Sequence, residues 1–147
     1  MLFRSGMDVV PVPGASALAA ALSVSGTQGP FAFLGFLPAK GSARRRALES
    51  WRDFPHALVL YEAPHRILDC VRDLALVLGG DRHVVIAREL TKLFESVHAC
   101  RLADAHAWLA AEADRQRGEF VLIVSGAPPA ADDHARSEEH TSELQSQ

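Results

Sequence analysis

The chain has 147 residues, of which 48% are hydrophobic and 22% charged, and its formal net charge is −3. These values are typical of one soluble globular domain with a core of its own, and they exclude a disordered chain. They also exclude a strong overall basic excess, so any nucleic-acid contact must depend on a local patch. No apolar run reaches membrane-spanning length. The two cysteines are far apart, which argues against a disulfide framework and fits a reducing cytoplasm.

Strands and helices are expected to alternate along the chain. A short strand at residues 8–12 precedes an Ala-rich helix at residues 15–25, which Gly26 can terminate. Further strands are expected at residues 31–36, 57–61, 83–88, about 95–101 and 119–125. Further helices are expected at residues 43–52, 65–78 and 102–114.

Hydrophobic patterns indicate how these elements pack. Apolar residues three and four apart give the second of the later helices one apolar face: Ile67, Val71, Leu74 and Leu78. The continuous apolar runs at 84–87 and 120–124 are typical of central strands that are buried on both sides. The chain around Leu93 and Phe94 leaves no room for a helix between two strands, so a mixed sheet is expected. The sequence therefore predicts an α/β fold.

Four short segments could carry chemistry. Three follow expected strands and contain polar or charged residues: Phe36-Leu37-Pro38-Ala39-Lys40, Tyr61-Glu62-Ala63-Pro64-His65-Arg66 and Ala87-Arg88-Glu89-Leu90-Thr91-Lys92. Such strand ends can build a site along one edge of a sheet. The fourth, at residues 13–17, is a turn of small residues that would let a ligand approach the backbone at a helix start, although it could be an ordinary turn.

The sequence has one basic cluster, formed by Lys40, Arg44, Arg45 and Arg46. Lysine and arginine neutralise phosphates and supply much of the affinity for RNA. The alternative is a solvated helix start, although a positive cluster there opposes the helix dipole. The pattern favours an RNA contact.

The other charged residues leave alternatives open. Glu62 could hold an amine or hydroxyl of a ligand, or it could pair with Arg66 or Arg88. His65 could act in the site or form a hydrogen bond at a helix start. The charged run at 88–92 could emerge at the rim of the sheet or be a solvated surface.

The sequence motifs of several enzyme classes are absent. The sequence contains no GxGxxG, P-loop, HExxH or GxSxG pattern, and its histidines show no metal-ligand spacing. The sequence therefore provides no basis for a hydrolase, an NTPase or a metal site.

Together, the four segments closely resemble the ribosomal small-subunit RNA 2′-O-methyltransferase family, which has the tetrapyrrole-methylase fold. The resemblance runs from about Asp8 to Gly126 and covers the rear part of such an enzyme. It implies methyl transfer from S-adenosyl-L-methionine to a cytidine ribose 2′-oxygen of 16S rRNA in the small ribosomal subunit, in the cytoplasm.

The resemblance also implies roles for individual residues. Cofactor contacts are expected from Gly14, Ala15, Ser16, Ala17, Pro38, Tyr61 and Glu62. RNA contacts are expected from Lys40, Arg44, Arg45, Arg46, His65 and Arg66. Glu89 or Lys92 could orient or deprotonate the ribose hydroxyl, and alignment for in-line displacement can contribute more than a strong base. No metal is expected.

Two alternatives to this function remain open. One is a methyltransferase of the same fold that acts on a tetrapyrrole-type small molecule, against which the basic cluster argues. The other is a non-catalytic RNA-binding module. Because most of the family's first domain is missing, the chain alone is expected to be inactive. The oligomeric state stays open, a homodimer included.

The expected domain organisation has five parts. Residues 6–30 are the end of a first, Rossmann-like domain with its linker helix, 31–126 form a C-terminal mixed-sheet domain, and 127–135 are expected to be disordered. Residues 1–5 and 136–147 look foreign. AGATCGGAAGAG encodes Arg-Ser-Glu-Glu, as at 136–139, and its reverse complement encodes Leu-Phe-Arg-Ser, as at 2–5. This is the pattern of an insert between two copies of one sequencing adapter.

Overall fold

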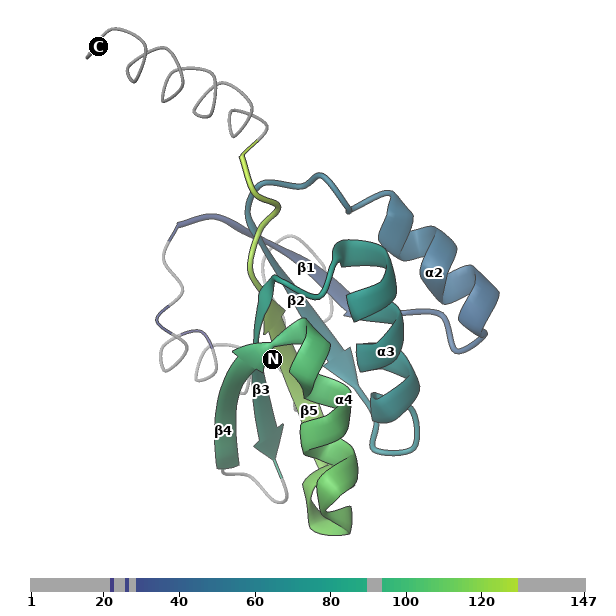
Figure 1. Ribbon diagram of the computed structural model, residues 1–147, viewed down its shortest axis with the longest axis vertical. Coiled ribbons are helices and arrows are strands. Elements are labelled where there is room, and N and C mark those ends of the chain that lie inside the picture. The colour runs from purple at the N-terminus through teal and green to yellow at the C-terminus, as the bar shows by residue number, and fades with distance from the viewer. Residues whose placement is uncertain (1–21, 23–25, 27–28, 90–93, 130–147) are drawn as a thin grey trace, which may run out of the picture.

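A computed structural model of the chain describes residues 22, 26, 29–89 and 94–129. Within these residues, five strands form one sheet in the order β1-β2-β5-β3-β4, with the helices packed against it (Figure 1). The strand expected at residues 8–12 lies outside the described residues. So does the helix expected at 15–25, apart from Leu22, which is helical.

The chain alternates between strands and helices for most of its length, as the sequence predicts. The elements are β1 (Phe31–Phe36), α2 (Gly41–Glu49), β2 (Ala57–Glu62), α3 (Ile67–Leu78), β3 (His83–Glu89), β4 (Phe94–Arg101), α4 (Leu102–Ala111), the 3-10 helix η1 (Ala113–Gln116) and β5 (Glu119–Val124).

The sheet is mixed, which confirms the prediction. β1 pairs with β2 in parallel, whereas β5 is antiparallel to both β2 and β3, and β4 is antiparallel to β3. Because β5 runs against both of its neighbours, β1, β2 and β3 all run in the same direction. Their carboxyl ends therefore lie at one edge of the sheet.

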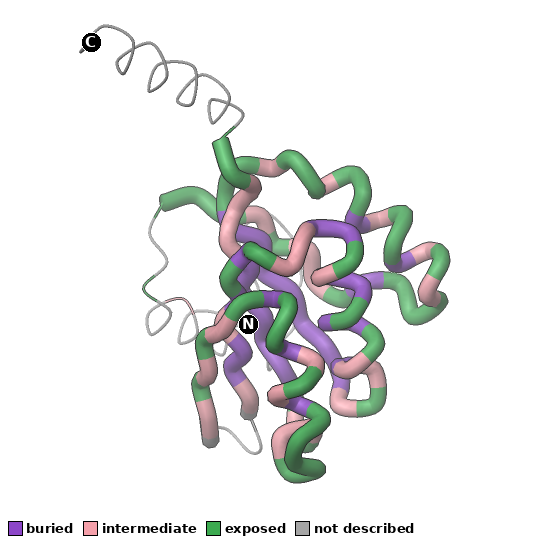
Figure 2. Tube along the Cα trace, viewed as in Figure 1, coloured by how far each residue is buried: buried purple, intermediate pink, exposed green. Residues whose placement is uncertain are grey.

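The main core lies between the sheet and α2, α3 and α4 (Figure 2). The apolar face predicted for α3 is buried there, and β2 and β5 are buried along almost their whole length. A second cluster covers the opposite face of the sheet: Ala57, Val59, Tyr61, Ala87, Val121 and Ile123. The residues at 84–87 and 120–124 thus belong to interior strands, as predicted.

Helix ends differ from the predictions because backbone hydrogen bonds at each end determine where the helix begins or stops. α2 begins at Gly41 because the Arg44 amide already donates to the Lys40 carbonyl, at 2.8 Å. α3 begins at Ile67, since the Arg66 amide donates to Ala63 in a tight turn. α4 ends at Ala111, and η1 replaces the last turn expected there.

The ordered fold continues past the last strand. The Ala127 amide donates to the carbonyl oxygen of Phe54 at 2.8 Å, which ties residue 127 to the loop before β2. Residues 130–135 of the segment expected to be disordered lie outside the described residues, as do the two terminal segments with adapter-like sequence.

Candidate functional site

The three segments that follow β1, β2 and β3 begin at the same edge of the sheet. β1 ends at Phe36, β2 at Glu62 and β3 at Glu89. The register places the start of β5 between the last two, because Phe120 pairs with Glu62 and Glu119 pairs with Glu89. The ends of these three strands therefore lie along one edge of the sheet, as expected from the sequence.

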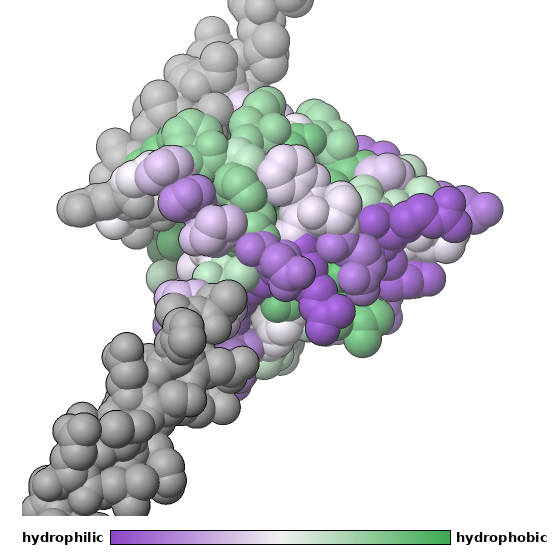
Figure 3. Space-filling model, turned by 90° about the horizontal axis from the view of Figure 1, so that it is seen from above, coloured by the Kyte–Doolittle hydropathy of each residue, from purple (hydrophilic) through white to green (hydrophobic). Residues whose placement is uncertain are grey.

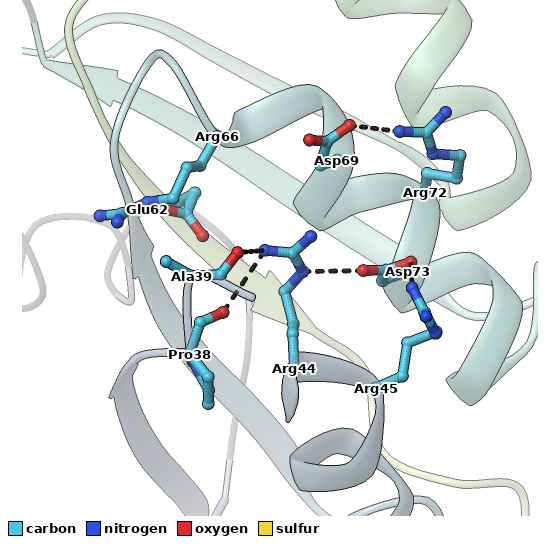
Figure 4. A network of polar contacts seen from close by, with 9 residues as sticks. All are labelled: Pro38, Ala39, Arg44, Arg45, Glu62, Arg66, Asp69, Arg72 and Asp73. Atoms are coloured by element: carbon cyan, nitrogen blue, oxygen red, sulfur yellow. Dashed lines mark hydrogen bonds and ion pairs between the residues drawn. The ribbon is translucent and has the colours of Figure 1, made fainter. Parts of the chain in front are cut away.

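Arg44 is the centre of a buried polar network beside this edge (Figure 4). Its Nε lies 2.8 Å from Oδ2 of Asp73 in α3. Its Nη1 donates to the carbonyl oxygens of Ala39, at 3.1 Å, and Pro38, at 3.4 Å. Only 4% of Arg44 and 5% of Asp73 are exposed. The guanidinium group is occupied inside the protein, so the prediction that Arg44 contacts RNA is corrected: its side chain is not available to a phosphate.

Asp73 is a residue of this network that the sequence reasoning missed. It follows Cys70 by three residues and precedes Val77 by four, so helical spacing places it among buried apolar residues of α3. A carboxylate at such a position needs a partner of opposite charge, and this signal could have indicated an ion pair. Arg45 is a second partner, with Nη1 3.4 Å from Oδ1 of Asp73, but its side chain remains 45% exposed.

Glu62 stabilises the turn between β2 and α3 and is only 1% exposed. Its Oε1 accepts hydrogen bonds from the Ala63 amide, at 2.8 Å, and from Arg66 Nε, at 3.1 Å. Burial, together with the nearby carboxylate of Glu62, raises the pKa of the Cys70 thiol, which therefore stays protonated. The contacts of Glu62 with Ala63 and Arg66 are those expected if Glu62 has a structural role and pairs with Arg66.

Arg88 lies across the sheet from Glu62, with Phe120 of β5 between them in the register. Its Nε donates to Ser96 Oγ at 3.3 Å. Among the described residues, no hydrogen-bond partner reaches its buried Nη1. Within this part of the chain, Glu62 is therefore paired with Arg66 and not with Arg88.

Tyr61 points to the opposite face of the sheet from Glu62, because neighbouring residues of a strand alternate. Its ring makes edge-to-face contacts with Phe33 and Phe36, at centroid distances of 5.0 and 5.8 Å. Pro38 is exposed just beyond β1. Of the residues predicted to bind cofactor, Tyr61 and Glu62 thus lie on opposite faces of the sheet.

Most of the residues predicted to bind RNA are exposed. Those that present their side chains to solvent are Lys40, Arg45, Arg46 and His65, and Arg66 is partly buried. Hydrophilic residues cover much of the side of the molecule on which α2 lies (Figure 3). Gly14, Ala15, Ser16, Ala17 and Lys92 lie outside the described residues, and of Glu89 only the backbone is described.

Two other kinds of feature are absent from the described ranges. Within them, no three His, Cys, Asp or Glu side chains come together to bind a metal ion. No helix of this part of the chain has the length and apolar character needed to cross a membrane.

This chain is similar in sequence to several curated proteins. The chain is 48% identical over 122 residues to "Ribosomal RNA small subunit methyltransferase I" of Pseudomonas aeruginosa, covering 82% of this chain and 43% of that protein. It is 51% identical over 124 residues to the protein of the same name from Xylella fastidiosa, covering 84% and 45%. For Escherichia coli O157:H7 the identity is 44% over 124 residues, covering 84% and 43%. The chain thus spans less than half the length of these relatives.

Two solved structures share the fold. The methyltransferase CobJ superposes with a TM-score of 0.53 at 16% identity, covering 75% of this chain and 47% of that one. The cobalt precorrin-4 methyltransferase CbiF, a cobalamin biosynthetic enzyme, gives 0.52 at 14% identity, covering 84% and 54%. Residues 1–106 match the family model for tetrapyrrole (corrin/porphyrin) methylases. The chain therefore belongs to the tetrapyrrole methylase family.

Proposed function

We propose that this chain is part of an enzyme that transfers a methyl group from S-adenosyl-L-methionine to a cytidine ribose 2′-oxygen of 16S rRNA in the small ribosomal subunit. The observation that carries this proposal is the 44–51% identity to proteins named ribosomal RNA small subunit methyltransferase I. The ribose position and the cytidine come from the resemblance of the four segments to the rRNA 2′-O-methyltransferases. The cytoplasm, where ribosomal subunits are assembled, is the proposed location.

The RNA would bind over the exposed cations at the start of α2. Lys40, Arg45 and Arg46 are exposed there, within a few residues of the sheet edge. Cationic side chains release counterions when they neutralise phosphates, and this supplies affinity without reading the base sequence. His65 is exposed beside the next segment and is proposed to extend the same surface.

S-adenosyl-L-methionine would supply a methyl group on a positively charged sulfur atom. Among the described residues that are expected to contact the cofactor, Pro38 is exposed, whereas Tyr61 and Glu62 are buried. Glu62 is enclosed by Ala63 and Arg66, and the ring of Tyr61 packs against Phe33. We therefore propose that Glu62 and Tyr61 shape the wall of the site, whereas contacts to the cofactor come from the Pro38 segment and from Gly14, Ala15, Ser16 and Ala17.

The segment after β3 would align the ribose. β3 ends at Glu89, whose backbone pairs with Glu119 at the same edge as the turn after Glu62. A ribose hydroxyl is a weak acid and the sulfonium is a good leaving centre, so positioning of the hydroxyl can contribute more than a strong base. Glu89 and Lys92 are proposed to hold the hydroxyl in line with the methyl group.

The proposal can be tested in a chimera, because the chain matches less than half of its relatives. This chain would replace the matching segment of the P. aeruginosa relative. The chimera would then be incubated with tritiated S-adenosyl-L-methionine and purified small subunits that lack the modification. We expect label in 16S rRNA that survives alkaline hydrolysis as a dinucleotide, because a 2′-O-methyl group blocks cleavage of the adjacent phosphodiester.

Each alternative function predicts a different result in the same experiment. Label that appears only when a tetrapyrrole is supplied would favour the small-molecule methyltransferase. A chimera that binds 16S rRNA without transferring label, while the parent relative does transfer it, would favour the non-catalytic module. An alkali-labile product would contradict methylation of the 2′-oxygen.

A further inference from the structure

The loop between β1 and α2 is held by a single buried side chain from the helix that follows it. Arg44 is the fourth residue of α2 and reaches back to the carbonyl oxygens of Pro38 and Ala39 (Figure 4). We propose that Arg44 and Asp73 are positioning residues for RNA: they fix the backbone of residues 38–40 and thereby present Lys40 and Arg45 to the phosphates. This inference rests on the proposed function.

Two nitrogen atoms of the Arg44 side chain reach three partners at once. Nε faces Asp73 at 2.8 Å, whereas Nη1 faces the two loop carbonyls at 3.1 and 3.4 Å. A guanidinium group is planar and carries its donors in a fixed fork, so satisfying one partner fixes the direction of the others. A lysine at this position could pair with Asp73 or with the loop, but it has no such fork. The loop is thus oriented relative to α3 through one rigid group.

The start of α2 has little else to stabilise it. Its N-cap residue, Lys40, makes no side-chain capping bond, and no acidic residue lies in the first turn. Positive charge there opposes the helix dipole, so a cluster of cations is intrinsically unfavourable at this end. The contacts of Arg44 with Ala39 and Asp73 tie the preceding loop to α3, but they do not replace a cap, because a guanidinium group only donates and cannot accept from the first-turn amides.

Asp73 also orients one of the exposed cations. Its second oxygen, Oδ1, lies 3.4 Å from Nη1 of Arg45, whose side chain is 45% exposed. One buried carboxylate thus holds Arg44 in the interior and restrains Arg45 at the surface. This arrangement would lower the side-chain entropy that Arg45 loses when it binds a phosphate.

The experiment compares three variants of the 147-residue chain. Arg44→Lys keeps the charge opposite Asp73 but removes the fork. Asp73→Asn keeps the shape but removes the carboxylate charge. Asp69→Asn is the matched control, because Asp69 lies one turn earlier in α3 and its ion pair with Arg72 is exposed. Backbone order is measured by ¹⁵N relaxation at Ala39, Lys40 and Gly41, and at the buried strand residue Leu60 as a reference.

The second measurement is binding to a 16S rRNA transcript at several salt concentrations. For Arg44→Lys we expect Ala39 and Lys40 to lose order while Leu60 keeps it, and the salt slope to fall by about 0.7–0.9 for each phosphate that is no longer neutralised. Asp69→Asn should match the wild type in both measurements. A purely structural role of Arg44 would lower stability without this local loss of order and without changing the slope.

The two measurements separate this inference from the proposed function. A loop that keeps its order in Arg44→Lys would overturn the positioning role, even if Asp73→Asn fails to fold. Loss of loop order with unchanged RNA affinity and slope would overturn the link between the loop and RNA. If the wild-type chain and a wild-type chimera both fail to bind the transcript, the RNA part of the proposed function fails, and the role of the pair in RNA binding fails with it.

Discussion

The imidazole of His98 lies flat against the indole of Trp108, with ring centroids 3.8 Å apart and an angle of 3° between the planes. The guanidinium of Arg115 lies over the same indole, 4.5 Å from its centroid. Burial lowers the pKa of His98 below its ordinary value of 6.5, and the positive charge of Arg115 lowers it further. Protonation of His98 is therefore less favourable in the folded chain than in the unfolded one.

This relationship predicts a loss of stability in acid. Well above pH 6.5 His98 is neutral in both the folded and the unfolded state, so it adds no pH dependence. As the pH falls below that value, the unfolded state binds a proton more readily than the folded state, and the free energy of unfolding decreases. His98→Phe keeps an aromatic ring against Trp108 but cannot titrate. Thermal melts at about pH 7.5 and about pH 5 should show a smaller drop for His98→Phe than for the wild type. Equal drops would contradict this account.

The strands could be predicted more closely than the helices. The bounds of β1 agree with the prediction, and the other strands differ by about one residue at an end. Apolar runs between turn residues mark strands well, because the burial of the sheet determines where they begin and end. The start of α3 could not be read in the same way. It depends on the hydrogen bond from the Arg66 amide to Ala63, which Pro64 and His65 accommodate.

At the candidate site, less could be predicted from the sequence than for the strands. Arg44, Arg45 and Arg46 are identical in type and consecutive, and the local pattern offers one weak distinction: Arg44 precedes Leu48, the other buried residue of α2, by four positions. The structure separates them because Arg44 faces α3, where Asp73 offers a buried carboxylate. Which arginine turns inward depends on how two helices pack, and this is a tertiary property. The edge itself was predictable, because strand ends follow from local patterns and a helix between two strands favours a parallel arrangement.

Gly126 should resist substitution. A Cβ atom there would lie 2.1 Å from the carbonyl oxygen of Pro55, and the clash is with backbone atoms that cannot rotate away. Gly126→Ala should therefore lower the free energy of unfolding by about 1–3 kcal/mol. Gly41→Ala is the control, because its Cβ would meet side-chain ends and no backbone atom: Arg45 Nη1 at 3.0 Å and Arg44 Nη2 at 3.8 Å. Alanine also favours the helix. Urea titrations of both variants check the prediction. Equal midpoints for Gly126→Ala and the wild type would refute it.

Removing Asp73 should be far more costly than removing Asp69. Asp73→Ala would leave the guanidinium of Arg44 buried without its carboxylate, and breaking a buried ion pair in this way costs about 3–5 kcal/mol. Asp69 pairs with Arg72 at the surface, where such pairs contribute about 0–1 kcal/mol. Denaturant titration of the two variants measures the difference. If Asp73→Ala were as mild as Asp69→Ala, the buried pair would not contribute to the fold.

The last prediction concerns the two exposed arginines of α2. Arg45→Ala/Arg46→Ala should weaken binding to 16S rRNA and reduce the salt slope by about 0.7–0.9 for each phosphate that these arginines neutralise in the wild type. The melting temperature of this double variant should stay close to that of the wild type, because both arginine side chains are exposed and Asp73 keeps Arg44 as its buried partner. Arg52→Ala is the matched control. Arg52 is also exposed, lies just after α2 and pairs only weakly with Glu49, at 3.7 Å.

A nonspecific effect of reduced positive charge would lower RNA affinity to a similar degree per arginine in Arg52→Ala and in the double variant. A local binding surface would lower it only in the double variant, because Arg52 lies at the other end of α2 from Lys40. Titration of the three chains with the same transcript, at two or more salt concentrations, distinguishes these cases. If the double variant keeps the wild-type slope, the start of α2 is a solvated surface. The phosphate contacts would then have to come from His65 and Arg66, at the turn after β2.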